Sequence, residues 1–172
     1  VNSVAAGDVD GDGLPDAVFG STGSEPLQLF LNTGGGFATI PDWESAADYG
    51  INEMLLVDVD GDGDLDLSAV TWKSGGTVLL FLNDGGTFPT TPSITYALPP
   101  AAGGEEAFID HNVVDGSMSW ADVDYDGQLE CAVGYVYWYG GDEPQVSILD
   151  LDDDVTTLTE VQRIAGVTAP LA

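Results

Sequence analysis

The sequence predicts an all-β fold made of three repeats of about four short strands each. Two observations lead to this prediction. Short runs rich in β-branched and aromatic residues alternate with clusters of Gly, Asn, Asp and Pro, and a nine-residue acidic segment occurs three times, at residues 8–16, 58–66 and 122–130. These segments begin 50 and then 64 residues apart, a period that is typical of a propeller, a solenoid or a tandem array.

The repeats divide the chain at residues 1–48, 49–114 and 115–172. The middle repeat is the longest, and its stretch rich in Pro, Gly and Glu near residues 99–115 predicts a surface insertion. The end of the third repeat, residues 166–172, is predicted to be a C-terminal linker.

The middle repeat shows the strand signals most clearly. Its apolar runs are short and nearly continuous, which predicts strands that are covered on both faces, as in stacked sheets. Helical periodicity is almost absent, and the one helical turn that we expect lies at residues 41–48, where Asp42 can cap it. The predicted strands of the middle repeat lie at residues 55–57, 65–70, 77–82 and 94–98.

The composition is strongly acidic. The chain has thirty Asp and Glu residues and two basic residues, Lys73 and Arg163, and its net charge is -28 at pH 7. Nucleic-acid binding needs clustered Lys and Arg, so this class of partner is excluded, and an anionic membrane surface is excluded for the same reason. Because self-repulsion of this size opposes compaction, we expect the fold to depend on bound metal or on salt.

The single cysteine and the hydropathy argue against a disulfide-linked fold and against a membrane-spanning protein. Cys131 cannot form an internal disulfide and lies in an apolar run, so we expect an inert buried thiol. The chain has no apolar run of 18 residues, and we therefore expect no insertion into a membrane.

Each acidic segment has the spacing of a calcium loop. Carboxylates stand at positions 1, 3, 5 and 9, glycines allow a tight turn, and the backbone carbonyl of position 7 can supply a further oxygen. The predicted ligands are Asp8, Asp10, Asp12, Leu14 and Asp16 in the first copy, Asp58, Asp60, Asp62, Asp64 and Asp66 in the second, and Asp122, Asp124, Asp126, Gln128 and Glu130 in the third.

Other cations and other loops fit this pattern less well. An EF-hand carries an acid at position 12, where this chain has Phe19, Ala69 and Val133. Magnesium keeps most of its waters, and zinc prefers His or Cys, of which there is one each. Asp-Gly clusters are also ordinary hairpin turns. Three copies at matching positions favour metal loops, which we expect to hold strands together rather than to bridge to a ligand.

The third copy departs from the other two. Tyr125 replaces a glycine and Glu130 replaces the final aspartate. We therefore expect calcium to fill the first two loops first and to bind the third loop most weakly or not at all. The three loops hold 13 of the 30 acidic residues, and three divalent ions would change the net charge from -28 to -22.

A second motif follows the first two acidic segments, at residues 29–37 and 80–88, with the form Leu-Phe-Leu-Asn-x-Gly-Gly-x-Phe. A degenerate version occupies residues 147–155. From the first loop aspartate to the central apolar residue the separations are 22 (Asp8 to Phe30), 23 (Asp58 to Phe81) and 26 (Asp122 to Ile148).

The pairing of Asp-x-Asp-Gly-Asp-Gly-x-x-Asp with this second motif resembles the FG-GAP/VCBS repeat, the blade unit of integrin α-subunit propellers and of many bacterial secreted proteins. The resemblance implies three four-stranded antiparallel blades of β-propeller type, with the acid loop joining the first two strands of a blade and binding calcium. Closed propellers usually have four or more blades. We therefore expect further repeats or other copies of the chain to complete a larger propeller, a tandem array or an assembly.

These observations lead to an expected function. We expect a calcium-stabilised structural or adhesion module that can self-associate, and an extracellular or cell-surface location, where calcium is millimolar. One alternative is lectin-like binding of a carbohydrate or a protein through the aromatic run at residues 135–139, which begins with Tyr135, and through Trp43, Trp72 and Trp120. Alternating rings on a strand, however, more often pack between blades. A less favoured alternative is a non-catalytic segment of a secreted enzyme. His111 is the only histidine, so no Ser-His-Asp set can form, and we expect no catalysis.

Overall fold

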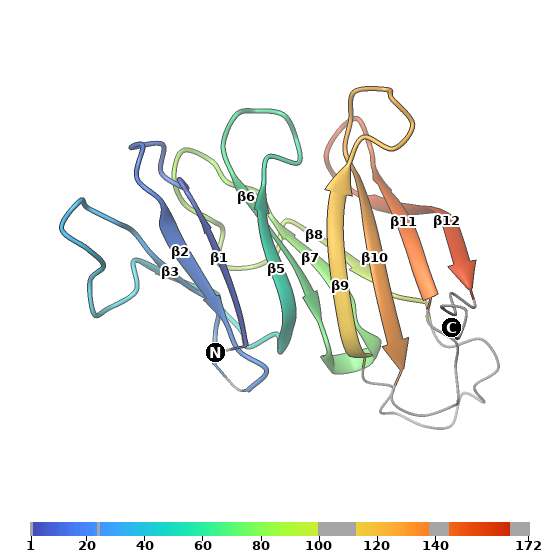
Figure 1. The fold of residues 1–172 in the computed structure, drawn as a ribbon, viewed down its shortest axis with the longest axis horizontal. Coiled ribbons are helices and arrows are strands. Elements are labelled where there is room, and N and C mark those ends of the chain that lie inside the picture. The colour runs from blue at the N-terminus through green and yellow to red at the C-terminus, as the bar shows by residue number, and fades with distance from the viewer. Residues whose placement is uncertain (1, 24, 100–112, 138–144, 166–172) are drawn as a thin grey trace, which may run out of the picture.

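The computed structural model describes residues 2–23, 25–99, 113–137 and 145–165. In this part of the chain, twelve strands form three four-stranded antiparallel sheets. Each strand pairs with the next one in the sequence, so every sheet is a meander (Figure 1). This confirms the predicted all-β fold of three four-stranded antiparallel units.

Each sheet takes its strands from one stretch of the chain. In all three sheets an acid loop connects the first strand to the second. The first sheet contains β1 (Ser3–Gly7), β2 (Asp16–Gly20), β3 (Gln28–Phe30) and β4 (Trp43–Glu44); the second contains β5 (Ile51–Val57), β6 (Asp66–Thr71), β7 (Thr77–Phe81) and β8 (Ile94–Ala97); the third contains β9 (Val113–Ala121), β10 (Glu130–Tyr137), β11 (Gln145–Leu151) and β12 (Leu158–Ala165).

The boundaries agree with the strand signals of the middle repeat, whose four predicted strands correspond to β5, β6, β7 and β8. In the segment predicted as a surface insertion, residues 100–112 lie outside the described residues, and residues 113–115 begin β9. The predicted linker at residues 166–172 also lies outside them. Among the described residues the helical structure is one 3-10 turn, Lys73–Gly75, and no helix there is long and apolar enough to cross a membrane.

The three sheets stand side by side, with the second between the other two (Figure 1). The first strands of neighbouring sheets contact one another, β1 with β5 and β5 with β9. All three acid loops lie at the same end of the stack, at the top of Figure 1. The described part of the chain forms an open stack, and its first and third sheets lie on opposite sides of the second.

Two hydrophobic cores hold the sheets together. Between the first and second sheets, Val18 and Leu29 pack with Leu67 and Phe81, whereas the core between the second and third sheets contains Val70 and its neighbours. Every residue of β6 is buried, and its apolar side chains divide between the two cores, with Leu67 and Ala69 in the first and Val70 in the second. This position between two sheets explains why the apolar runs of the middle repeat are nearly continuous.

The helical turn predicted at residues 41–48 is wrong, because Trp43–Glu44 forms β4. The carboxylate of Asp42 accepts the N–H of Leu31, directly after β3, at 2.9 Å and does not cap a helix. Trp43 is buried, and its ring packs edge-on against Phe81 and Phe88 at 5.8 and 5.4 Å between centroids. Burial of this ring and strand pairing therefore outweigh the local capping signal.

The predicted equivalence of Ile148 with Phe30 and Phe81 is off by one residue. In the first two sheets the phenylalanine pairs with the residue that follows loop position 9, and in the third sheet that partner is Leu149. Leu149 is fully buried, while Ile148 is partly exposed on the opposite face. Register follows the buried face of a strand, and the degenerate third motif carries no turn signal that would mark it.

Candidate metal centres

The three acid loops share three hydrogen bonds from backbone N–H groups to loop carboxylates. In each loop the N–H of position 6 donates to the carboxylate of position 1, at 2.9, 3.0 and 3.1 Å. The N–H of position 5 donates to the carboxylate of position 3 at 3.2 Å in all three loops, and the N–H of position 7 donates to the carboxylate of position 5 at 2.8, 2.8 and 2.9 Å. The repeated spacing in the sequence therefore produces one repeated loop conformation.

Position 4 of each loop has a left-handed backbone. Its φ is 73° at Gly11, 76° at Gly61 and 67° at Tyr125. Glycine adopts this conformation without steric cost, whereas a tyrosine does not. The third loop thus reaches the common conformation with a strained residue, which agrees with its departure from the motif.

The acid at position 9 has a second role that the spacing alone did not indicate. Asp16, Asp66 and Glu130 are buried, and each accepts the N–H of loop position 2, at 2.8, 2.9 and 2.7 Å. In the first two loops the other carboxylate oxygen accepts the backbone N–H of Asn32 or Asn83, at 2.8 Å in both cases. Position 9 therefore closes each loop, and in the first two loops it also ties the loop to the segment that follows the third strand of the same sheet.

Each loop brings three acidic side chains together. Within each group one oxygen per residue lies within 4.8 Å of the others, a spacing that suits a shared cation. Of the other predicted carboxylates, Asp12, Asp66 and Asp126 belong to the same loops but not to these groups. Leu14, Asp64 and Gln128 donate their N–H groups to position 5. The groups are Asp8, Asp10 and Asp16; Asp58, Asp60 and Asp62; and Asp122, Asp124 and Glu130.

The electrostatics of the loops favour a cation. Burial raises the pKa of Asp66 to about 6, and burial together with nearby carboxylates raises the pKa of Asp60. The Oδ1 atom of Asp8 is buried and has no hydrogen-bond partner among the described residues. An unpaired buried carboxylate oxygen is costly, and a bound cation would remove this cost. The donor set of carboxylates therefore fits a hard cation such as calcium.

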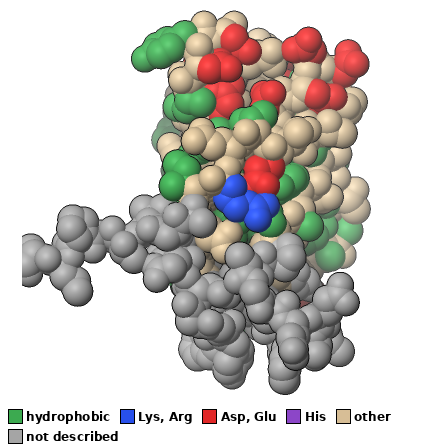
Figure 2. Space-filling model, turned by 90° about the vertical axis from the view of Figure 1, so that its right-hand side faces the viewer, with side chains coloured by type: hydrophobic (Ala, Val, Ile, Leu, Met, Phe, Trp, Pro, Cys, Tyr) green, Lys and Arg blue, Asp and Glu red, His purple; other side chains and the backbone are tan. Residues whose placement is uncertain are grey.

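The basic side chains are already engaged elsewhere. Lys73 pairs with Asp48 at 2.7 Å, and Arg163 pairs with Glu160 at 2.5 Å. Figure 2 shows the side of the molecule formed by the third sheet, where acidic side chains gather at the end that carries the acid loops. Neither basic side chain therefore pairs with a carboxylate of an acid loop in these ion pairs.

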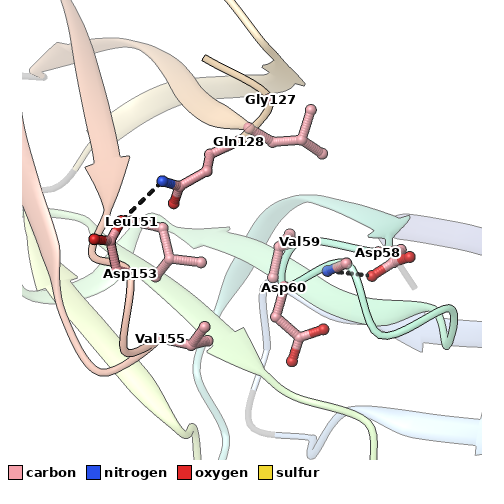
Figure 3. Close-up of a pocket in the computed structure, with 10 residues that line it drawn as sticks. Asp58, Val59, Asp60, Gly127, Gln128, Leu151, Asp153 and Val155 are labelled. Atoms are coloured by element: carbon pink, nitrogen blue, oxygen red, sulfur yellow. Dashed lines mark hydrogen bonds between the residues drawn. The ribbon is translucent and has the colours of Figure 1, made fainter.

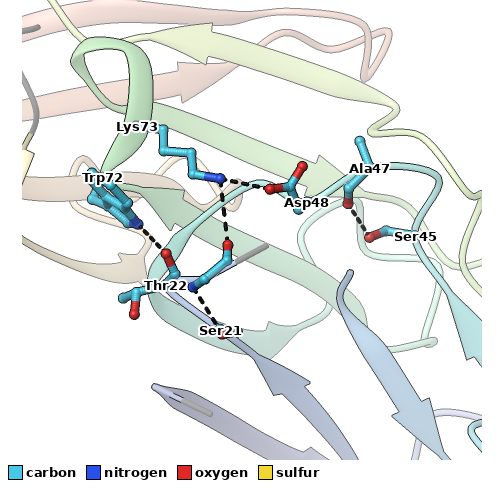
Figure 4. A network of polar contacts seen from close by, with 8 residues as sticks. Ser21, Thr22, Ser45, Ala47, Asp48, Trp72 and Lys73 are labelled. Carbon is cyan, nitrogen blue, oxygen red and sulfur yellow. Dashed lines mark hydrogen bonds and ion pairs between the residues drawn. The ribbon is translucent and has the colours of Figure 1, made fainter. Parts of the chain in front are cut away.

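The aromatic residues considered as ligand-binding candidates pack at the sheet interfaces. Trp43 and Tyr135 are buried in the two cores, and Trp120 packs against the second core. At the far ends of β2 and β6, the indole N–H of Trp72 donates to the carbonyl of Thr22 at 3.1 Å (Figure 4). These contacts join neighbouring sheets, as the packing alternative predicted.

The last part of the aromatic run, residues 138–139, lies outside the described residues, and so does His111.

A cavity separates the second acid loop from the third sheet. It has a volume of about 370 Å³ and is lined on one side by Asp58, Val59 and Asp60. Leu151, the last residue of β11, lies across it together with Asp153 and Val155 of the turn that follows (Figure 3). Sequence reasoning missed this cavity, because it depends on how the degenerate third motif packs against the preceding sheet.

The stacked meander sheets, each with an acid loop between its first two strands, define a repeat module of β-propeller type. Residues 8–69 match the family model of the FG-GAP-like repeat. This match begins at the first residue of the first acid loop and ends in β6, so the predicted resemblance to FG-GAP repeats is confirmed for this stretch. A search of the curated proteins found none that matches the chain.

Proposed function

We propose that this chain is a calcium-stabilised structural or adhesion module. The observation that carries the proposal is the threefold repetition of one loop geometry, which gathers three acidic side chains each time in a chain with only two basic residues. The buried Oδ1 of Asp8, which lacks a partner among the described residues, supports it. Calcium binds six to eight oxygen ligands and tolerates irregular geometry, so these loops suit it better than magnesium.

When bound, calcium would neutralise the clustered carboxylates and hold the first two strands of each sheet together. In the first two loops, the ion would be held by the acids at positions 1, 3, 5 and 9 together with the carbonyl of Leu14 or Asp64. The third loop would bind more weakly because of Tyr125 and Glu130. Since such loops serve best at millimolar calcium, an extracellular or cell-surface location suits this function.

The outer face of the first sheet supports an associating role. Val4 is 58% exposed, and Phe19 packs edge-on against Phe30 at 5.5 Å between centroids on the same face. The residues at matching pairing positions in the second sheet, Met54 and Phe81, are buried against the first sheet. We therefore propose that a further blade, from another copy of the chain or another repeat, covers this face.

Light scattering coupled to size exclusion tests the association of copies. In the presence of calcium, the measured average molar mass should rise with protein concentration. Val4→Asp should shift the association equilibrium toward the monomer. A monomer at all concentrations would reject the second copy as the covering partner and would favour a further repeat. Trp43 and Tyr135 are buried and Trp120 is partly buried against the second core, so these candidate rings support a structural role rather than carbohydrate binding.

Calcium removal is the direct test of the proposed function. A ligand that binds only the folded state at 100 times its Kd stabilises it by about 2.7 kcal/mol, so a chelator should lower the Tm clearly. Asp58→Asn should reduce the calcium-dependent part of the Tm, whereas Glu25→Gln, which removes the same charge from an exposed position outside the loops, should leave it intact. A melting curve that is insensitive to chelator would reject the proposal.

A further inference from the structure

One turn touches both of the first two acid loops. It follows β7 at residues 83–87 and begins with Asn83. On the side of its own sheet, the backbone N–H of Asn83 donates to Asp66 Oδ1 at 2.8 Å, and its side-chain Nδ2 donates to the carbonyl of Leu65 at 3.1 Å. The same Nδ2 also donates to the carbonyl of Val9 in the first acid loop at 2.8 Å.

These bonds form a continuous path between two position-9 carboxylates. The N–H of Val9 donates to Asp16 Oδ2 at 2.8 Å, and the carbonyl of the same residue accepts Asn83, which in turn donates its backbone N–H to Asp66. Val9 is 1% exposed and Asn83 is 3% exposed. Water therefore cannot easily replace these bonds, and a break in the path would leave buried polar groups unpaired.

The turn also rests directly on the first loop. A Cβ placed on Gly86 would lie 3.1 Å from the Cα and Cβ atoms of Asp10. The side-chain Oδ1 of Asn83 accepts the N–H groups of Gly86 and Thr87, both at 2.9 Å, and so sets the shape of the turn. Asn83 therefore determines both the polar bridge and the packing between the two loops.

The corresponding residues of the other sheets make no such bridge within the described structure. Asn32 donates its backbone N–H to Asp16 and its Nδ2 to the carbonyl of Pro15 at 3.2 Å, both within its own repeat. In the third sheet the matching place is taken by Leu151, which has no side-chain donor. The cavity of about 370 Å³ lies between Leu151 and the second loop (Figure 3).

We propose that Asn83 couples the first two acid loops, so that calcium in one loop raises the affinity of the other, while the third loop binds independently. This inference rests on the proposed calcium binding. An ion bound by Asp16 would fix the backbone at Val9, because Asp16 accepts the N–H of Val9. The carbonyl of Val9 would then hold the side chain of Asn83, whose backbone N–H donates to Asp66. The second loop then needs less ordering to bind. By linkage the effect is reciprocal.

A pair of matched substitutions tests the role of Asn83. Asn83→Leu places at this position the residue type that the third sheet has, and Asn32→Leu makes the same change at the equivalent asparagine. We expect calorimetric titration of the full chain with calcium at fixed ionic strength to show positive coupling of about fivefold or more for the wild type. Asn32→Leu should retain this coupling, and Asn83→Leu should abolish it.

A second measurement leaves Asn83 in place. Asp58→Asn disables the second loop and should weaken calcium binding at the first loop by the coupling factor, and Asp8→Asn should weaken the second loop by the same factor. Asp122→Asn, in the third loop, should change neither. Equal titrations for the two leucine variants, or an unchanged first loop in Asp58→Asn, would overturn the coupling while leaving calcium binding intact. No binding at any loop would overturn the proposed function as well.

Discussion

Gly20 and Met54 meet across the interface between the first two sheets. A Cβ on Gly20 would lie 3.0 Å from Met54 Sδ and 3.1 Å from the Cβ of Ile51. The equivalent residue of the third sheet is Gly134, where the nearest heavy atom to a Cβ among the described residues would be Ser117 Oγ, at 3.6 Å. The interface between sheets, rather than the strand itself, therefore requires glycine at position 20.

This contrast predicts different effects of the same substitution. Gly20→Ala should lower the free energy of unfolding by about 1 to 2 kcal/mol, because the added methyl group overpacks a filled interface. Gly134→Ala should cause no loss, since space is available and alanine restricts the unfolded chain. Urea denaturation at constant calcium would measure both. Equal losses at the two positions would show that the close approach is not the cause.

Replacement of the strained residue in the third loop should stabilise the protein. Tyr125 is 91% exposed and has a φ of 67°. Tyr125→Gly should stabilise the protein by about 0.5 to 1 kcal/mol, because glycine removes the cost of the left-handed backbone. Tyr125→Ala removes the same ring but keeps a Cβ, and it should give no such gain. Thermal denaturation of the three proteins in parallel would test this, and equal stability of the two variants would reject the strain.

The cysteine offers a probe of the third sheet. Cys131 is fully buried, and burial raises the pKa of its thiol to about 12. The folded protein should therefore resist a thiol reagent at pH 8. Cys131 directly follows Glu130 of the third loop, so chelation should make it reactive if metal holds this sheet together. Rapid labelling in the presence of calcium would contradict the buried position.

A pH prediction concerns the turn that follows β11. Hydrogen bonds from the Thr156 hydroxyl and from the N–H groups of Thr156 and Thr157 lower the pKa of Asp152 to about 2, against 3.8 ordinarily. Because the folded-state pKa is lowered, this carboxylate stabilises the fold above about pH 4, and the contribution is lost as the pH falls toward 2.

The Asp152→Asn variant isolates that contribution. In chelator, its unfolding free energy should lie below that of the wild type at pH 5, and the difference should shrink as the pH falls to 2. Asp154→Asn, which changes an exposed carboxylate two residues away, should show no such narrowing. A difference that stays constant with pH would mean that the charge of Asp152 does not contribute.

Much of the fold and the site could be predicted because it depends on local chemistry. Glycine at positions 4 and 6 permits a left-handed backbone, and aspartates at alternate positions can accept the N–H groups of their own loop. The strands of the middle repeat are short apolar runs between turn residues, so their number and approximate limits follow from the sequence. The same local logic placed Cys131 in the interior.

Where the prediction failed, long-range packing decided the outcome. At residues 41–48 a capping signal gave way to β4, because Trp43 is buried between Phe81 and Phe88. The register of β11 moved by one residue, because Leu149 occupies the buried face. In both cases the choice depends on a neighbouring sheet, which no local pattern specifies.

The sequence by itself determined three acid loops of one conformation and three sheets of four strands, since turn chemistry and alternation act over a few residues. The tertiary structure alone decided how the loops relate to one another. Asn83 reaches a carbonyl 74 positions earlier in the chain, and a cavity takes the corresponding place beside the third sheet. Such contacts arise when two sheets pack face to face, because packing brings together residues whose separation along the chain carries no signal.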